Sequence, residues 1–162
     1  MENEEFVCLT CEFVVKNNDE YCLNCGTILT ENKKCNCHHV VEAEGICLIC
    51  LKLCCQKCGL YTNGVYLCNE HSNYEIIEGM ARVYGSNDSL ELEYYKDILE
   101  KECLHPFLYS RKSDSILLGD FDYSLYWGEF NGKPLNEIKL MLPLNEVIEA
   151  ENILEPLIDN SN

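Results

Sequence analysis

The clearest apolar periodicity lies in the second half of the chain, where hydrophobic residues recur at intervals of three and four. The pattern predicts a helix over residues 89–104 whose buried face carries Leu92, Tyr95, Leu99 and Cys103. Asp88 precedes Ser89, and Glu91 follows at the spacing of a capping box, which favours a helix start here. Pro106 lies just beyond the expected end.

Shorter apolar runs after this helix predict strands at residues 115–118, 123–127 and 137–142. The segment Phe130-Asn-Gly-Lys133 is typical of a hairpin turn leading into the last of them. A final helix is expected over 146–155 and should end before Pro156; its apolar face carries Val147, Ala150, Ile153 and Leu154. Residues 76–162 are therefore predicted to form a small, acidic α+β domain.

The first half of the chain is expected to have little aliphatic core and shows a different kind of pattern. Twelve of the 13 cysteines fall within the first 68 residues, most of them in pairs. This change of composition places a domain boundary near residues 72–79. Paired cysteines at CxxC spacing are typical of structural zinc sites, in which two pairs surround one ion and leave no position open for a substrate.

A disulfide framework is the alternative for a chain this rich in cysteine. The number of cysteines is odd, and CxxC is a poor spacing for a structural disulfide. The first residues lack the basic and apolar segments of a signal peptide. We therefore expect an intracellular protein, cytoplasmic or nuclear, with reduced thiols that bind zinc.

The first two pairs are separated by ten residues, and a glycine follows the second pair. The sequence Cys8-Leu-Thr-Cys11, then Cys22-Leu-Asn-Cys25-Gly26, resembles the short zinc ribbons in which two knuckles close one four-cysteine site. Gly26 stands where such a knuckle commonly needs a positive φ. Between the pairs, residues 13–15 predict a strand, residues 17–19 a turn, and residue 21 the start of the returning strand. This predicts a zinc ribbon over residues 1–30.

Four more ligand pairs follow from residue 35 onward: Cys35 with His38, Cys47 with Cys50, Cys55 with Cys58, and Cys68 with His71. Four pairs imply two zinc ions, and so about three Zn²⁺ for the whole chain. The order resembles the B-box family of cross-braced zinc domains, in which alternate pairs share an ion. The resemblance implies one site of Cys35, His38, Cys55 and Cys58 and another of Cys47, Cys50, Cys68 and His71, within a B-box-like domain over residues 31–75.

Three further donors, Cys37, His39 and Cys54, lie among these ligands. Because Cys54 and Cys55 are adjacent, the third pair is ambiguous by one residue. We interpret His39 as an ordinary exposed residue and Cys54 as a small buried one.

Catalysis by these sites is not predicted. The chain has neither HExxH nor the HxE and PCxxC signature of zinc deaminases, and every four-ligand set can close. A RING ubiquitin ligase is also cross-braced, but eight residues separate His38 from Cys47, more than the RING pattern has. A degenerate RING stays open as an alternative. It would need exposed apolar residues to engage a conjugating enzyme, for which Leu48, Ile49 and Leu51 are the candidates.

The formal charge is −16, with no basic stripe and no apolar run of about 18 residues that could span a membrane. Nucleic acid is thus an improbable partner, and the only local basic candidates are Lys33, Lys34, Lys52 and Lys57. The sequence favours a zinc-binding adaptor or regulatory factor that contacts a protein partner, with the aromatic segment from Tyr123 to Phe130, around Trp127, as its binding face. A transcription or nucleic-acid regulator, of viral or other origin, is the alternative.

Overall fold

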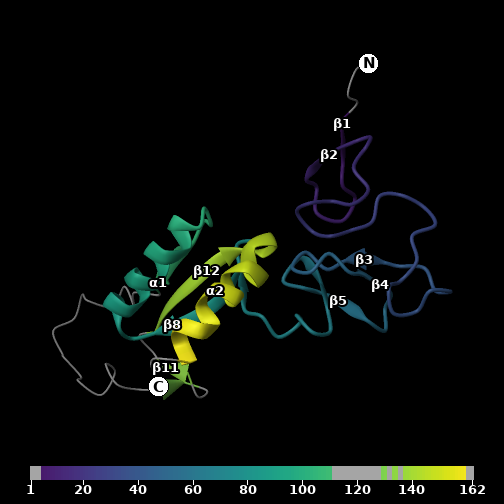
Figure 1. The fold of residues 1–162 in the computed structure, drawn as a ribbon. Helices are drawn as coiled ribbons and strands as arrows, with labels where there is room; N and C mark the ends of the chain where they lie inside the picture. Colours follow the sequence, from purple (N-terminus) through teal and green to yellow (C-terminus); the bar gives the residue numbers. More distant parts are fainter. Residues whose placement is uncertain (1–4, 111–128, 131–132, 135–136, 160–162) are drawn as a thin grey trace. The chain divides into compact units, whose positions relative to one another are not determined.

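The computed structural model describes residues 5–110, 129–130, 133–134 and 137–159. The chain divides into two compact units, Met1–Gly79 and Met80–Asn162, which we call the first and second unit. The first unit contains both predicted zinc modules. Figure 1 shows the elements of each unit.

The described part of the first unit is built from short antiparallel strand pairs. Its strands are β1 (Glu5–Val7), β2 (Val14–Lys16), β3 (Gly45–Ile46), β4 (Leu53–Cys54), β5 (Gly59–Thr62), β6 (Val65–Cys68) and β7 (Ile76–Ile77). β1 pairs with β2, β3 with β4, and β5 with β6. About half of the buried apolar residues here are cysteines. Because many of its aliphatic side chains are exposed and its strands are short, a unit of this size has little hydrophobic core of its own to stabilise it.

Each of the first two cysteine pairs lies at the end of a hairpin. β1 and β2 flank Cys8 and Cys11, and an isolated bridge between Tyr21 and Ile28 flanks the second pair. The predicted strand at residues 13–15 is present as β2. Its partner, however, is β1, so Tyr21 does not begin a strand that returns along β2. A hairpin that closes around each pair holds its two sulfurs together more directly than one that joins the two pairs.

The second unit combines two helices with an antiparallel sheet. Its elements are β8 (Met80–Ser86), α1 (Ser89–Lys101), β9 (Phe107–Ser110), β12 (Ile138–Pro143), the 3-10 turn η2 (Leu144–Glu146) and α2 (Val147–Asp159). In the sheet, β12 lies between β8 and β9. A separate hairpin joins β10 (Glu129–Phe130) to β11 (Lys133–Pro134), as the turn signal at residues 130–133 predicted. The strand that this turn was expected to lead into, β12, pairs with β8 and β9 instead. The predicted strands at 115–118 and 123–127 lie outside the described residues.

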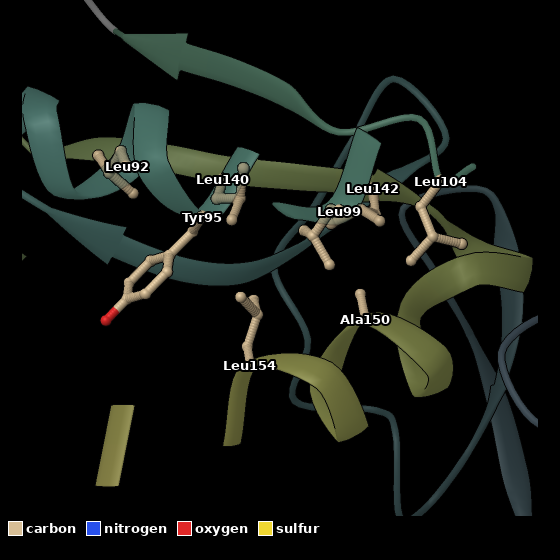
Figure 2. Packing of buried hydrophobic residues seen from close by; sticks show 8 residues of the cluster. All are labelled: Leu92, Tyr95, Leu99, Leu104, Leu140, Leu142, Ala150 and Leu154. Atoms are coloured by element: carbon tan, nitrogen blue, oxygen red, sulfur yellow. The ribbon is translucent and has the colours of Figure 1, made fainter. Parts of the chain in front are cut away.

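The hydrophobic core of the second unit lies between the sheet and both helices. Figure 2 shows side chains of α1 and α2 directed toward one another beside β12. The buried members of this core are Leu92, Tyr95, Leu99, Leu104, Leu140, Leu142, Ala150 and Leu154. Among the described residues, this core contains no cysteine or histidine.

Helix α1 begins where the sequence predicted, but its cap is only half of a capping box. Asp88 accepts hydrogen bonds from the N–H groups of Leu90 and Glu91. The Glu91 carboxylate does not return to the Asp88 N–H, which donates to Ser86 instead. The Glu91 carboxylate accepts hydrogen bonds from the hydroxyls of two tyrosines, Tyr84 and Tyr95.

The end of α1 differs from the prediction. The helix stops at Lys101, and Cys103 has a left-handed φ of 64° and is exposed rather than buried. The N–H of Leu104 donates to the Leu99 carbonyl, and that of Cys103 donates to Glu100, which is the pattern of a Schellman motif. The chain therefore reverses at Cys103, and Leu104 enters the core in its place.

Helix α2 continues past Pro156 to Asp159, so the predicted stop at residue 155 is wrong. A proline inside a helix removes one backbone hydrogen bond and usually ends it. Here Leu157 and Ile158 pack against the core of the second unit, and this burial favours continuing the helix.

Candidate metal centres

Three groups of four side chains in the first unit could each hold a metal ion. In every group the four donor atoms lie within 4.8 Å of one another. We name them by their first residues: the Cys8 cluster (Cys8, Cys11, Cys22 and Cys25), the Cys35 cluster (Cys35, His38, Cys55 and Cys58) and the Cys47 cluster (Cys47, Cys50, Cys68 and His71). The structure thus brings all twelve predicted ligands together, four to a group.

Sulfur–sulfur distances in the Cys8 cluster fit a tetrahedral ion. The sulfurs of Cys8 and Cys25 lie 3.7 Å apart, and those of Cys11 and Cys22 lie 3.5 Å apart. A zinc ion with ligands at about 2.3 Å places neighbouring sulfurs about 3.8 Å apart. A disulfide would need about 2.05 Å, and all thirteen cysteines of the chain are free.

The Cys35 cluster combines three sulfurs with one imidazole nitrogen. The Cys58 sulfur lies 3.7 Å from that of Cys35 and 3.9 Å from that of Cys55. Nδ1 of His38 lies 3.9, 3.5 and 3.1 Å from the sulfurs of Cys35, Cys55 and Cys58. These distances scatter around the value of about 3.6 Å expected between sulfur and nitrogen ligands of one tetrahedral zinc ion.

The Cys47 cluster has the same donor set, with a different pair supplying the histidine. Nδ1 of His71 lies 3.5 Å from the Cys47 sulfur and 3.2 Å from the Cys68 sulfur. The sulfurs of Cys50 and Cys68 lie 3.8 Å apart. Two clusters of three cysteines and one histidine, drawn alternately from the same segment, make a cross-braced arrangement.

Three of the CxxC pairs are followed by a backbone turn of the same conformation. The residue after the second cysteine donates its N–H to the carbonyl of the first and has a positive φ, as seen for Glu12 (59°), Gly26 (79°) and Leu51 (57°). The prediction for Gly26 is confirmed. The same conformation at Glu12 and Leu51 was not predicted, because residues with a Cβ rarely adopt it.

Burial and backbone hydrogen bonds shift the pKa values of two thiols of the Cys8 cluster in opposite directions. Burial raises the pKa of the Cys22 thiol to about 12. Burial also acts to raise the pKa of Cys8, but hydrogen bonds from the backbone of Thr10 and Cys11 outweigh it and lower this pKa to about 6. Four thiols this close cannot all ionise together without a cation, so metal binding at the Cys8 cluster must release protons.

The three surplus donors lie outside the clusters. Cys54 is buried, and its thiol donates to the Lys52 carbonyl at 3.5 Å. Burial raises the pKa of this thiol to about 12. Cys37 and His39 are exposed. The ambiguity between Cys54 and Cys55 is therefore resolved in favour of Cys55 as the cluster member.

Two residues that the sequence analysis did not single out lie beside the Cys8 cluster. The Cys25 sulfur is 3.0 Å from the Thr27 hydroxyl, and this hydroxyl is 2.7 Å from that of Tyr61. A threonine two residues after a knuckle is a weak signal. Tyr61 is far from the cluster in sequence, so no local pattern could have indicated it.

Comparison of the chain with known protein families, with curated proteins and with solved structures found no match. The character of the clusters therefore rests on their own geometry and donor types. Among the described residues, neither helix is long and apolar enough to cross a membrane.

Proposed function

We propose that the protein is a zinc-binding adaptor or regulatory factor, in which three structural zinc ions hold a rigid surface for a protein partner. The observation that carries this proposal is that each cluster has four protein donors converging on one point. A catalytic zinc site keeps only three protein ligands and leaves the fourth position to water or substrate. Sites with four ligands are typical of structure rather than catalysis.

Zinc is the metal that fits these donors best. Each cluster offers thiolates alone or thiolates with one imidazole, and a tetrahedral set of this softness favours zinc over magnesium, calcium or manganese. In this proposal the Cys8 cluster is a zinc ribbon, and the Cys35 and Cys47 clusters form a B-box-like cross-brace.

The pairing of the lysines supports a protein partner over nucleic acid. Three of the four candidate lysines form ion pairs with glutamates: Lys33 with Glu20 at 2.9 Å, Lys34 with Glu42 at 3.4 Å, and Lys52 with Glu70 at 2.7 Å. The hydrogen bond between Lys52 and Glu70 raises the pKa of the lysine and lowers that of the glutamate. Lysines neutralised in this way, on a chain of net charge −16, offer little attraction to a phosphate backbone.

Burial of the apolar residues between Cys47 and Cys50 argues against the ubiquitin-ligase alternative. Leu48 and Ile49 are only 6% and 4% exposed, while Leu51 is 54% exposed. A conjugating enzyme would therefore meet one apolar side chain here instead of three.

Exposed apolar side chains around the Cys8 cluster provide a candidate surface for the partner. They are Phe6, Val7, Leu9, Phe13, Val14 and Leu23, and Leu9 is fully exposed. Residues 1–30 carry six acidic side chains against one lysine. The fitting partner is a protein segment with apolar contact residues and a basic rim. The aromatic segment from Tyr123 to Phe130 remains a prediction, because its side chains lie outside the described residues.

The proposal is tested by comparing Leu9→Asp with Val40→Asp, a matched change at another exposed apolar position. Cross-linking in the native cell identifies the partner, and the purified pair gives the affinity. We expect both variants to retain about three zinc ions, while only Leu9→Asp weakens the partner, by roughly 2 kcal/mol if Leu9 is a hot spot. Trp127→Ala tests the aromatic segment in the same assay.

Equal binding by wild type, Leu9→Asp and Trp127→Ala would reject both surfaces. Nanomolar, sequence-specific binding to DNA or RNA would favour the regulator alternative, and zinc-dependent formation of ubiquitin chains would favour the ligase.

A further inference from the structure

One residue, Tyr66 on β6, touches a knuckle of each metal cluster. Its N–H donates to the carbonyl of Cys25 at 2.8 Å, which belongs to the Cys8 cluster. Its carbonyl accepts from the N–H of Leu48 at 3.2 Å, inside the knuckle of the Cys47 cluster. Its hydroxyl donates to the carbonyls of Cys54 at 3.2 Å and Cys55 at 3.4 Å, the latter a member of the Cys35 cluster.

The Tyr66 side chain has no room to move. It is 1% exposed, and three glycines lie against it. A Cβ added to Gly45 would lie 2.4 Å from the ring, one added to Gly59 would lie 2.8 Å from it, and one added to Gly26 would lie 3.1 Å from the Tyr66 Cβ. Real Cβ atoms do not approach other atoms as closely as the first two distances, so the packing around Tyr66 requires these glycines.

A second connection joins the cross-brace to the Cys8 cluster through side chains. Tyr61 on β5 contacts the Thr27 hydroxyl, which contacts the Cys25 sulfur. A metal-bound thiolate can only accept a hydrogen bond, so Thr27 must donate to Cys25 and Tyr61 must donate to Thr27. The Tyr61 ring also packs edge-on against Tyr66, with centroids 4.9 Å apart.

Backbone hydrogen bonds also join the turn after Cys25 to strand β3. The N–H of Ile46 donates to the Gly26 carbonyl at 2.9 Å, and Thr27 forms a bridge with Gly45. The turn that holds Cys22 and Cys25 is therefore bonded to β3 and β6, the strands that lead to Cys47 and Cys68 of the Cys47 cluster. Opening of the knuckle at Cys22–Cys25, Cys47–Cys50 or Cys55–Cys58 would break a hydrogen bond of Tyr66.

From these contacts we infer that the three clusters form one cooperative metal-binding unit, centred on Tyr66, with Tyr61 acting as a positioning residue for the Cys8 cluster. The affinity of each ion then depends on the presence of the others. This inference rests on the proposed function, because it requires that the clusters bind zinc.

Cooperativity is tested by titrating the full-length protein with a zinc chelator. Native mass spectrometry then measures how many zinc ions each chain retains at each chelator concentration. Coupled sites should give mainly chains with three ions or none. Independent sites of similar affinity would give mostly chains with one or two ions at the midpoint. Cys8→Ser should then lose zinc from the two remaining clusters at roughly tenfold lower chelator concentration.

The role of Tyr61 is tested with Tyr61→Phe, which removes only the hydroxyl. We expect about tenfold weaker metal affinity at the Cys8 cluster. Cadmium NMR provides the site-resolved readout, because a four-cysteine site and a site with one histidine give separate signals. Tyr94→Phe, at an exposed tyrosine of α1, is the matched control and should change nothing.

The possible outcomes separate this inference from the function on which it rests. If Cys8→Ser leaves the other two ions at wild-type affinity, or if Tyr61→Phe behaves like Tyr94→Phe, the coupling is wrong although three zinc ions still bind. If the wild-type protein binds no zinc, the proposed function fails.

Discussion

At the scale of single residues, the knuckles show how one backbone conformation is reached with and without glycine. Glu12, Gly26 and Leu51 occupy equivalent positions with similar positive φ values. Gly26 lies against another backbone, where an added Cβ would be 2.5 Å from the Ile46 carbonyl oxygen. Sequence spacing predicted the positive φ of Gly26 but not this close contact, which depends on a strand twenty residues later.

Gly26→Ala should therefore destabilise the first unit by about 1–3 kcal/mol, because it adds a steric clash to the backbone strain. Gly64→Ala is the matched control. Gly64 has a similar φ of 83°, but nothing lies within 4 Å of its added Cβ. The control should lose only about 1 kcal/mol. Melting temperatures at fixed free zinc measure the difference, and equal losses in both variants would show that the Ile46 contact is unimportant.

At the scale of elements, the sequence predicted the parts that depend on local pattern. It predicted the start of α1, the buried face of Leu92, Tyr95 and Leu99, and most of β12. It missed β8 and β9, whose pairing with β12 depends on residues far along the chain. It also misplaced the ends of both helices, where Leu104 in one case and Leu157 and Ile158 in the other gain tertiary contacts that periodicity cannot show.

The end of α1 provides an element-scale prediction. Cys103 occupies the left-handed position of the Schellman motif, where glycine is the favoured residue. Cys103→Gly should raise the unfolding free energy of the second unit by about 0.5–1 kcal/mol. Leu104→Ala, next to it, should lower it by about 2–4 kcal/mol because it removes a buried side chain. Chemical denaturation measures both; a loss of stability in Cys103→Gly would contradict the assigned helix end.

At the scale of the whole molecule, the two units owe their stability to different interactions. In the first unit, three clusters could each hold a metal ion and about half of the buried apolar residues are cysteines, whereas the described core of the second unit contains no cysteine or histidine. The spacing of the cysteines and histidines indicated the ligand pairs, and the resemblance to the B-box family implied their grouping, but the choice between Cys54 and Cys55 stayed open until the structure was known. The spacing could not predict that Tyr66 and Tyr61 tie the clusters together, because that contact is set by tertiary packing.

Removal of zinc should therefore unfold the first unit and leave the second intact. With excess chelator, amide hydrogen exchange should become fast across residues 8–71 while the amides of α1, α2 and β12 stay protected. Adding zinc back under reducing conditions should restore protection. Simultaneous loss of protection in both units would mean that the second unit is not stable by itself.

The central claim is that the first unit is built on three closed zinc sites. The most direct measurement is the intact mass of the purified, full-length protein under native and denaturing conditions, combined with elemental analysis. The account predicts three zinc ions per chain and thirteen reduced cysteines, in agreement with the three clusters and the free thiols of the structure. One zinc ion per chain or fewer, or a mass lowered by disulfide formation, would contradict it.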